Sequence, residues 1–380
     1  MEIPSYYTLD LETSIKNRGE DAIGKHQASP YHPDNKVVLA AGGVWVMNGD
    51  CPPPPEKGEI LVGQNLKFDL QYLLKEERWR TWLIKESKDC VWDTMIVEYL
   101  LTGQEQKMPS LDKLAENYGG TLKDDKIKEY WKEGIDTEDI PYSELYEYLI
   151  ADIKNTSLVF EQQWELVHRL GIYDLVKSQM EAMLALTQME INGMHFDKDK
   201  ARDAAASLLV DLNADLSYAK SIMKTGYEEH ETYDPNPLSN KQLSSYLFGG
   251  EIEFTVDAPV LEDGEPVRYK SGKKKGEIKT KKTKEKRIQV GKYLPSKPMG
   301  AAGYYPVGDE VLVELGDPLG DIVMTCRDKK KQISTYFIGY SDLTWPDGLI
   351  HPNYLQARTD TGRLSCTQPN LQNVSSKKEE

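Results

Sequence analysis

Residues 6–13 read Y-Y-T-L-D-L-E-T, and this stretch decides how the first part of the chain folds. It overlaps a short run of β-branched and aromatic residues, 3–11, which predicts a strand. Side chains of a strand alternate between its two faces, so Asp10 and Glu12 point to the same face. The stretch therefore predicts two carboxylates side by side on one strand.

Two further acidic motifs follow this strand. N-L-K-F-D ends at Asp69 and comes after the apolar run 60–63, which predicts a second strand that leads into an amphipathic helix. Y-L-I-A-D runs from Tyr148 to Asp152 in a helix expected from 142 to about 163, and a spacing of four places both residues on one helical face. The strands, the helix start and the helix face can meet at one cleft.

The acidic motifs suit metal chemistry when they are taken together. Alone, Asp10 and Glu12 could be a solvated strand end, Asp69 a favourable charge at a helix dipole, and Tyr148 with Asp152 a surface pair. Hydrolysis of a phosphodiester with two divalent cations needs carboxylates from separate segments and a polar group that aims the attacking water. The combination, in this order, predicts a metal-dependent nuclease.

The three motifs resemble the Exo I, Exo II and Exo III motifs of the DEDD exonuclease superfamily, in the tyrosine-bearing subclass found in family A DNA polymerases. Residues 357–374, A-R-T-D-T-G-R-L-S-C-T-Q-P-N-L-Q-N-V, are similar to the thumb-to-palm junction motif T-G-R-L-S-S-x-x-P-N-L-Q-N-I-P of the same family. Cys366 replaces its second serine and Ser375 its final proline. Residues 189–197 and 238–248 also resemble family A thumb sequence, so the resemblance to Pol I-like, phage-type polymerases spans nearly the whole chain.

This resemblance implies three parts. Residues 1–165 are expected to form an α/β, RNase H-like exonuclease domain with a mixed sheet flanked by helices. Residues 166–345 are expected to form a mainly helical thumb region, and 346–380 the start of a palm. Residues 250–310 lose hydrophobic periodicity and gain Gly, Lys and Pro, which predicts an irregular, Lys-rich insertion in the thumb.

Local patterns also predict the elements within these parts. Strands are expected at 3–11, 36–47 and 60–63, and helices at 66–78, 93–102, 110–118, 142–163, 175–190, 198–223 and within 311–342, before an extended, turn-rich segment at 343–374. Asp93, in W-D-T-M-I, is one more carboxylate, which is expected to be the N-cap of the helix that follows it.

The mechanism that the resemblance implies is two-metal hydrolysis of the 3′-terminal phosphodiester of single-stranded or frayed DNA. Asp10 would bridge two Mg²⁺ or Mn²⁺ ions, Glu12 and Asp152 would complete the shell of the ion that activates water, and Asp69 would hold the second ion through water. Tyr148 would orient the attacking water. A phenol titrates near pH ~10, so Tyr148 is not expected to be a strong general base.

The resemblance also implies DNA-contacting residues. Arg363 is expected to reach the primer-side minor groove, with the amides of Asn370, Gln372 and Asn373 along the duplex, although a surface salt bridge is the simpler interpretation of Arg363 without its motif. Minor-groove acceptors are nearly independent of sequence, which suits Arg and amide donors. Asn65 is grouped with these residues and is expected to support the turn before Asp69.

The net charge of −15 would repel nucleic acid if it were spread evenly. Residues 268–287, however, hold eleven Lys or Arg against two Glu. This run is either a solvated loop or a contact with duplex phosphates, and its place in the thumb favours the contact.

Cysteine usage and hydropathy exclude several other classes of protein. The four cysteines show no C-x-x-C spacing, so neither a zinc site nor a disulfide framework is expected. Without an apolar run long enough for a bilayer, no membrane contact is expected, and the chain is expected in the cytoplasm of a bacterial or phage-infected cell.

Three functions remain open at this point. The first is the proofreading exonuclease and duplex-holding part of a family A polymerase, which would not polymerise alone because the palm and finger motifs are absent, and which would need a palm and fingers polypeptide as partner. Its insertion at 250–310 is a candidate site for a processivity factor. The second is a free-standing DEDD exonuclease, which leaves 357–374 without a use. The third is a non-catalytic DNA-binding or assembly half of a split polymerase, against which the intact carboxylates and tyrosine argue.

Overall fold

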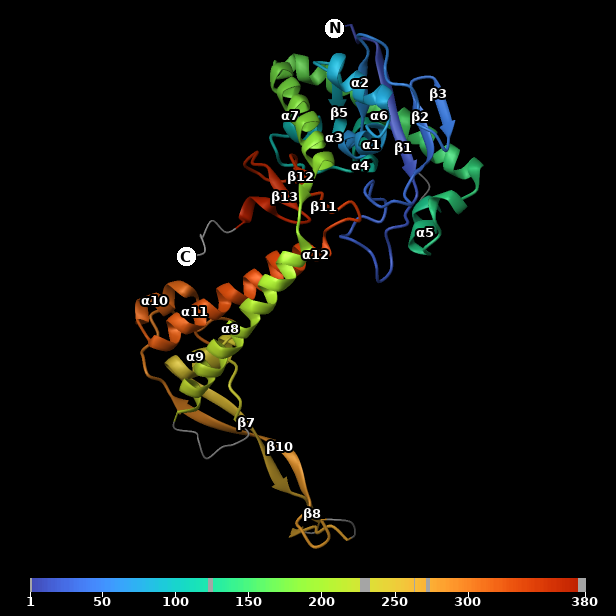
Figure 1. Cartoon of the computed structure of the whole chain (residues 1–380). Helices are drawn as coiled ribbons and strands as arrows, with labels where there is room; N and C mark the ends of the chain where they lie inside the picture. The colour runs from blue at the N-terminus through green and yellow to red at the C-terminus, as the bar shows by residue number, and fades with distance from the viewer. Residues whose placement is uncertain (1, 122–125, 226–232, 263, 271–273, 375–380) are drawn as a thin grey trace. The chain divides into compact units, whose positions relative to one another are not determined.

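A computed structural model describes residues 2–121, 126–225, 233–262, 264–270 and 274–374, except for the side chains at 254 and 256 (Figure 1). By its packing the chain divides into two units: residues 1–197 with 339–380, and residues 198–338. The last six residues of the expected palm segment, 375–380, with Ser375 of the junction motif, lie outside the described residues.

The first unit is built on a mixed five-stranded sheet. Its strand order is β3-β2-β1-β4-β5, with β1 in the middle, antiparallel to β2 and parallel to β4. The strands are β1 (Tyr6–Thr13), β2 (Val37–Gly42), β3 (Trp45–Asn48), β4 (Ile60–Gly63) and β5 (Val91–Asp93). This sheet, with the helices that flank it, confirms the expected fold class.

The strand expected at 36–47 is a hairpin of two strands. β2 and β3 pair antiparallel and are joined by a turn in which Gly43 has a φ of +57°. The ring of Tyr7 packs so closely that a Cβ on Gly43 would lie 2.8 Å from it. A glycine is therefore needed at this turn, which is why the apolar run does not continue as one strand.

Helices cover the sheet, and most begin where the sequence predicts. They are α1 (Leu66–Leu73), α2 (Glu77–Lys85), α3 (Thr94–Leu101), α4 (Leu111–Tyr118), α5 (Lys126–Lys132), α6 (Tyr142–Leu170) and α7 (Tyr173–Asn192). The same unit also contains the short helix α12 (Gly339–Asp342). The helix expected at 66–78 is two helices, α1 and α2. The helix expected at 142–163 continues to Leu170 and ends at Gly171, which adopts φ +69° as its C-cap.

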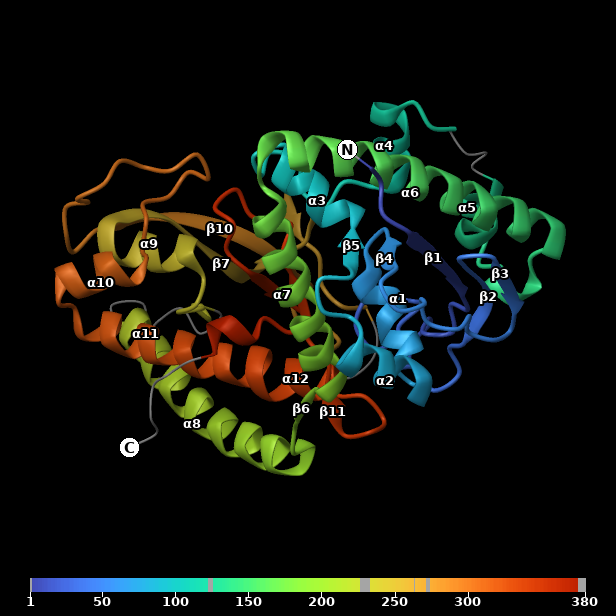
Figure 2. The ribbon, with the colours of Figure 1, turned by 90° about the horizontal axis from the view of Figure 1, so that it is seen from above.

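The core of this unit joins the sheet to α1, α2, α3, α6 and α7, and α6 runs beside β1 (Figure 2). Phe160 of α6 is fully buried, with its ring centroid 4.8 Å from that of Tyr6, 5.3 Å from that of Trp92 and 5.8 Å from that of Trp164. These contacts join the centre of the sheet to the long helix and fix where α6 lies along β1.

Residues 343–374 add two small strand pairs to the first unit, in keeping with the extended, turn-rich segment expected there. β11 (Leu349–Ile350) pairs with β6 (Met194–His195), and β12 (Asn353–Leu355) pairs with β13 (Ser365–Thr367). A short 3₁₀ helix, Leu371–Asn373, follows.

The second unit is mainly helical, as expected for its sequence. It contains α8 (Lys198–Lys224), α9 (Asn240–Phe248), α10 (Asp309–Leu315), α11 (Pro318–Lys331) and a π-helical stretch, Gln332–Ile338. Its main core joins α8, α9, α10 and α11 through buried residues such as Met223, Leu243, Leu312 and Val323. Among the described residues, no helix has both the length and the apolar content needed to cross a membrane.

The insertion expected to be irregular at 250–310 is a long hairpin over much of its length. β7 (Gly249–Pro259) pairs antiparallel with β10 (Thr280–Val290), while residues 263 and 271–273 of the insertion lie outside the described residues (Figure 1). Lys284 Nζ lies 2.6 Å from Glu253, and Lys286 Nζ lies 3.0 Å from Glu251. Polar and apolar residues alternate in E-I-E-F-T-V-D-A, residues 251–258, which is a local sign of a strand. β10 is almost wholly polar, and cross-strand charge pairs accompany its pairing with β7.

Phe160→Ala is expected to lower the free energy of unfolding of the first unit by about 3–5 kcal/mol, because it removes a fully buried ring that three aromatic rings contact. Urea denaturation followed by tryptophan fluorescence would measure the loss. Ile84→Ala, at a side chain that is 82% exposed, should change the stability by less than about 0.5 kcal/mol. Equal losses for the two variants would contradict this account of the core.

Candidate metal centre and active site

β1 and α6 run side by side in matching steps. Tyr6 Oη donates to Glu161 at 2.6 Å, and two residues further along β1 the Thr8 and Ser157 hydroxyls lie 2.7 Å apart. Two residues of a strand advance about 6.6 Å and four residues of a helix advance about 6 Å, so each step of two on β1 meets one turn of α6. The next side chains on this face of β1 therefore lie opposite the preceding turns of α6.

Those next side chains are Asp10 and Glu12, and the preceding turn of α6 contains Asp152. One carboxylate oxygen of each of the three lies within 4.8 Å of the other two. Glu12 and Asp152 are each 6% exposed, and Asp10 is partly buried. Like charges this close and this buried are unfavourable without a cation, and hard carboxylate oxygens suit Mg²⁺ or Mn²⁺. These three residues could hold a divalent metal ion.

Asp69 lies beside this cluster, in the first turns of α1. It is 4% exposed, and burial, followed by the charge of Asp10, raises the pKa of its carboxyl well above the usual range. Asp69 is not one of the three residues whose oxygens share the 4.8 Å cluster. The arrangement therefore places a fourth carboxylate within electrostatic reach of Asp10, but at a separate position.

Tyr148 and Asp152 both lie on α6, one turn apart, as expected. The ring of Tyr148 is half-buried and packs edge-on against Trp131 of α5, with centroids 6.0 Å apart and planes at 86°. The Trp131 indole N–H donates to Thr137 Oγ1 at 3.1 Å. Trp131 thus supports the tyrosine ring, a role for which the sequence carries no local motif.

Asp93 ends β5 and caps α3, as expected: its side chain accepts hydrogen bonds from the backbone N–H groups of Met95 and Ile96. Asn65 precedes α1 with φ +59° and ψ +43°, and its side chain makes no capping hydrogen bond. Asn65 therefore supports the start of α1 by its backbone conformation, which Asn adopts more readily than most residues.

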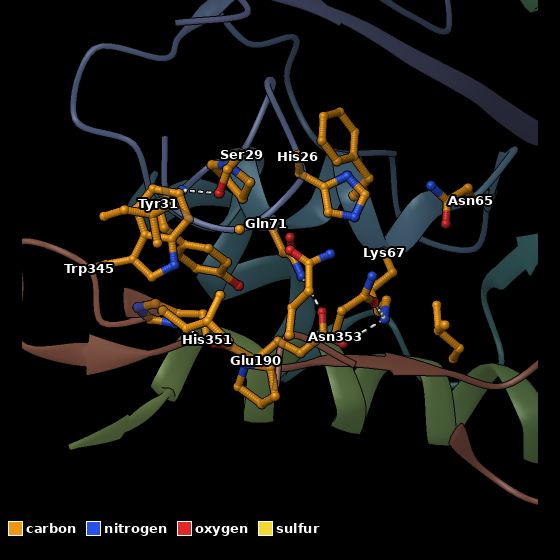
Figure 3. A pocket seen from close by; sticks show the side chains of 18 of the residues that line it. His26, Ser29, Tyr31, Asn65, Lys67, Gln71, Glu190, Trp345, His351 and Asn353 are labelled. Carbon is orange, nitrogen blue, oxygen red and sulfur yellow. Dashed lines mark hydrogen bonds and ion pairs between the residues drawn. The ribbon is translucent and has the colours of Figure 1, made fainter. Parts of the chain in front are cut away.

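A cavity of about 130 Å³ lies next to α1 (Figure 3). On one side Tyr31 stacks on His351, with ring centroids 3.7 Å apart and planes at 5°. On another side Glu190 of α7 accepts hydrogen bonds from Lys67 Nζ at 2.5 Å and from Gln71 Nε2. Both lysine and glutamine belong to α1, so the helix that carries Asp69 is anchored to α7.

The Lys67–Glu190 pair also bonds to the segment that follows residue 339. The Tyr354 N–H donates to Glu190 at 2.5 Å, and Lys67 Nζ donates to Asn353 Oδ1 at 2.9 Å. Three residues, Gln71 of α1 and Asn353 and Tyr354 of β12, thus bond to the Lys67–Glu190 pair. No local sequence motif marks these residues, because their contacts span more than 100 positions.

The junction motif exposes its polar side chains. Arg363, Asn370, Gln372 and Asn373 are all exposed, and in the part of the chain that the structure describes the Arg363 guanidinium has no ion pair. The salt bridge considered for Arg363 is therefore not seen among these residues. Asn370 Oδ1 accepts the Gln372 N–H at 3.1 Å and caps the short helix 371–373. Contact of these side chains with the minor groove stays a prediction.

Two protein-family models match separate parts of the chain. Residues 56–167 match the model described as 3′-5′ exonuclease, and residues 262–380 match the model of DNA polymerase family A. The first range contains Asp69, Tyr148 and Asp152, whereas Asp10 and Glu12 precede it.

Curated relatives agree with these matches. DNA polymerase I of Chloroflexus aurantiacus is 27% identical over 93% of this chain and 32% of its own length, and DNA polymerase I of Bacillus subtilis is 26% identical over 82% and 30%. DNA polymerase DpoZ of Salmonella phage PMBT28 is 22% identical over 84% of this chain and 47% of the phage protein. The chain spans a third or less of these bacterial relatives.

A solved structure shows the same fold. It is described as the POL domain of Pol1 from M. smegmatis in complex with DNA primer-template and dNTP, and it aligns with a TM-score of 0.60 and 17% identity over 99% of this chain and 53% of the other. Together the matches confirm the resemblance to family A DNA polymerases: an exonuclease region is followed by the start of a polymerase region. They also confirm, at the level of the family model, the prediction of a nuclease enzyme.

Asp69→Asn is expected to remove part of the pH dependence of stability in metal-free protein. Burial and Asp10 raise the pKa of Asp69 above 3.8, so the folded chain binds this proton more tightly than the unfolded chain. The free energy of unfolding of the wild type should therefore rise as pH falls through the raised pKa toward 3.8, and fall as pH rises through the raised pKa.

Urea denaturation in EDTA across this pH range would compare the two proteins. Asp34→Asn, at an exposed carboxylate of the same unit, should keep the slope of the wild type. A slope that Asp69→Asn leaves unchanged would show that Asp69 is not the group that binds the proton.

Proposed function

We propose that this chain is the proofreading 3′-5′ exonuclease and duplex-holding part of a family A DNA polymerase. The observation that carries the proposal is the cluster of Asp10, Glu12 and Asp152 oxygens within 4.8 Å, beside the buried Asp69. The match of residues 56–167 to the 3′-5′ exonuclease model supports it independently. The reaction is hydrolysis of the 3′-terminal phosphodiester of single-stranded or frayed DNA.

The carboxylates would hold two divalent cations, Mg²⁺ or Mn²⁺. When bound, such ions lower the pKa of a water ligand and neutralise charge on the reacting phosphate. Glu12 and Asp152 share a cluster with Asp10, while Asp69, outside that cluster, feels the charge of Asp10 more than that of Glu12. Asp10 would therefore be shared between the two ions, with Asp69 reaching the second through water.

Tyr148 would orient the attacking water. It lies one helical turn before Asp152, and the edge of Trp131 restricts its ring. A phenol remains protonated at neutral pH, so its hydroxyl can fix the direction of a water by hydrogen bonding and is a poor general base.

The second part of the proposed function is the binding of duplex DNA. Arg363, Asn370, Gln372 and Asn373 present exposed donors that suit the degenerate acceptors of the minor groove, with Asn65 nearer the nuclease site. The primer-template in the complex of the M. smegmatis protein supports a similar substrate here.

The Lys-rich hairpin is a weaker part of this grip than its sequence suggests. Residues 249–290 hold eleven basic residues against eight acidic ones, and Glu251 and Glu253 pair with lysines of β10. We propose that residues 268–287 contact DNA phosphates. The acidic residues that pair with the lysines reduce the electrostatic attraction to these phosphates.

A free-standing exonuclease is the second candidate. The match of residues 262–380 to the DNA polymerase family A model argues against it, because an independent nuclease needs no such region.

The first experiment is a degradation assay on 5′-labelled single-stranded and mismatched-primer DNA with Mg²⁺ or Mn²⁺. Wild type should give a metal-dependent ladder, and the double variant Asp10→Ala/Glu12→Ala should be inactive because it removes two of the three clustered ligands. Tyr148→Phe should lower the rate by up to about a hundredfold, since it disturbs the position of water without removing a ligand.

Glu147→Ala is the matched control, because Glu147 is an exposed carboxylate on the same helix. It should retain the wild-type rate. If the wild type does not cleave, or if the double variant cleaves as fast as the wild type, the proposed nuclease is refuted.

Arg363→Ala is expected to weaken primer-template binding by about tenfold, to a similar extent for different DNA sequences, because a minor-groove donor contributes affinity with little specificity. Fluorescence anisotropy with several duplexes would measure it. Arg202→Ala, which removes an exposed arginine paired with Asp199 on α8, should bind as tightly as the wild type. A loss limited to one sequence would contradict the assignment of Arg363.

A further inference from the structure

Asp93 makes more contacts than a helix cap requires. Its side chain is buried, with the residue 1% exposed, at the end of β5. Within α3 it accepts the N–H groups of Met95 at 2.9 Å and Ile96 at 3.3 Å. It also accepts the N–H groups of Asn65 at 3.2 Å and Leu66 at 2.8 Å, which begin α1. One carboxylate therefore caps two helices.

The two carboxylate oxygens of Asp93 accept different numbers of hydrogen bonds. Oδ1 accepts the bonds from Met95, Ile96 and Asn65, whereas Oδ2 accepts the bond from Leu66. An ionised carboxylate has two acceptor oxygens and no donor, so it can face four N–H groups. An amide of the same shape has one acceptor and would set its own NH₂ against one of them.

The start of α1 depends on the hydrogen bonds from Asn65 and Leu66 to Asp93. Asn65 has the N-cap position but makes no side-chain capping bond, so the first N–H of α1, that of Leu66, and the N–H of Asn65 find their acceptor in Asp93. The pairing of Gly63 with Asp93 in the parallel strands β4 and β5 brings that carboxylate to the end of β4. Asp69 follows Leu66 by three residues and lies in the first turn of α1.

We propose that Asp93 is a positioning residue for Asp69: by holding the first turn of α1, it keeps the Asp69 carboxylate beside Asp10 in the geometry that a second metal ion needs. This inference rests on the proposed function. Asp93 itself is turned toward backbone N–H groups of two helices and is not assigned as a metal ligand. The cluster of Asp10, Glu12 and Asp152 is built on β1 and α6, and α1 contributes none of its three residues.

Asp93→Asn tests the inference selectively. Asn is a good N-cap, so its Oδ1 can keep the bonds to α3, while the bond from Leu66 to Oδ2 is lost. Titration with Mn²⁺, followed by electron paramagnetic resonance, should show that the affinity for the more tightly bound ion is unchanged and that the affinity for the second ion is lower than in the wild type. Mutation of a residue that orients a metal ligand typically lowers the affinity for the metal by about 10–100-fold, and a loss of about tenfold is expected here for the second ion.

Activity should show the same selectivity. The exonuclease rate of Asp93→Asn should fall by about tenfold at limiting Mn²⁺ and recover at saturating Mn²⁺, because raised ion concentration compensates for weaker binding. Asp69→Ala is the reference, since it should lose the second ion without this recovery. Asp93→Ser, which can cap α3 with a shorter side chain, provides a second variant should the asparagine protein fail to fold.

Asp317→Asn is the matched control in the second unit. Asp317 is buried and caps α11 in the same way, with Oδ1 accepting the Leu319 N–H at 2.8 Å and Oδ2 accepting the Tyr293 hydroxyl at 2.9 Å. The same chemical change there should leave the affinity for both Mn²⁺ ions unchanged.

The outcomes separate the inference from the proposed function. Wild-type protein that binds two Mn²⁺ ions but cleaves no DNA refutes the nuclease, while the titration still tests Asp93. An active wild type whose Asp93→Asn variant binds both ions normally refutes the positioning role alone. Equal weakening of both ions, or a wild type with a single Mn²⁺ ion, would also overturn it.

Discussion

The fixed register between β1 and α6 is the constraint on which the site depends. Hydrogen bonds from Tyr6 and Thr8 to successive turns of α6 set this register, and the buried ring of Phe160 holds it from within the core. Once it is set, Asp10 and Asp152 have to meet, although 142 positions separate them in the chain. The chemistry of the site is thus a consequence of how a strand and a helix match their repeats.

This register places acidic groups where they oppose folding. Asp10, Glu12 and Asp152 repel one another, and the buried Asp69 binds its proton more tightly than usual. The surrounding structure therefore has to hold these groups against their own charges. A cation relieves the same repulsion, so binding metal and stabilising the folded state are linked events in this unit.

Much of the site could be predicted from the sequence, because each of its motifs is local. The period of two places Asp10 beside Glu12, and the period of 3.6 places Tyr148 beside Asp152. The Asp93 cap was likewise readable, but only for the helix that follows it. Its bonds to α1 and the hydrogen bonds of Glu190 join distant segments, and no local pattern records which segments will be neighbours.

The Lys67–Glu190 pair has a consequence for how the chain can be divided. By sequence, residues 1–165 look like a separable domain, yet α1 is bonded to α7 and, through Asn353 and Tyr354, to strand β12. A truncation that keeps only 1–165 leaves the largely buried Lys67 without its counter-charge, and one that ends at 197 removes Asn353 and Tyr354, which bond to the pair. The residues that hold α1 in place therefore extend beyond residue 165, where the nuclease domain is expected to end.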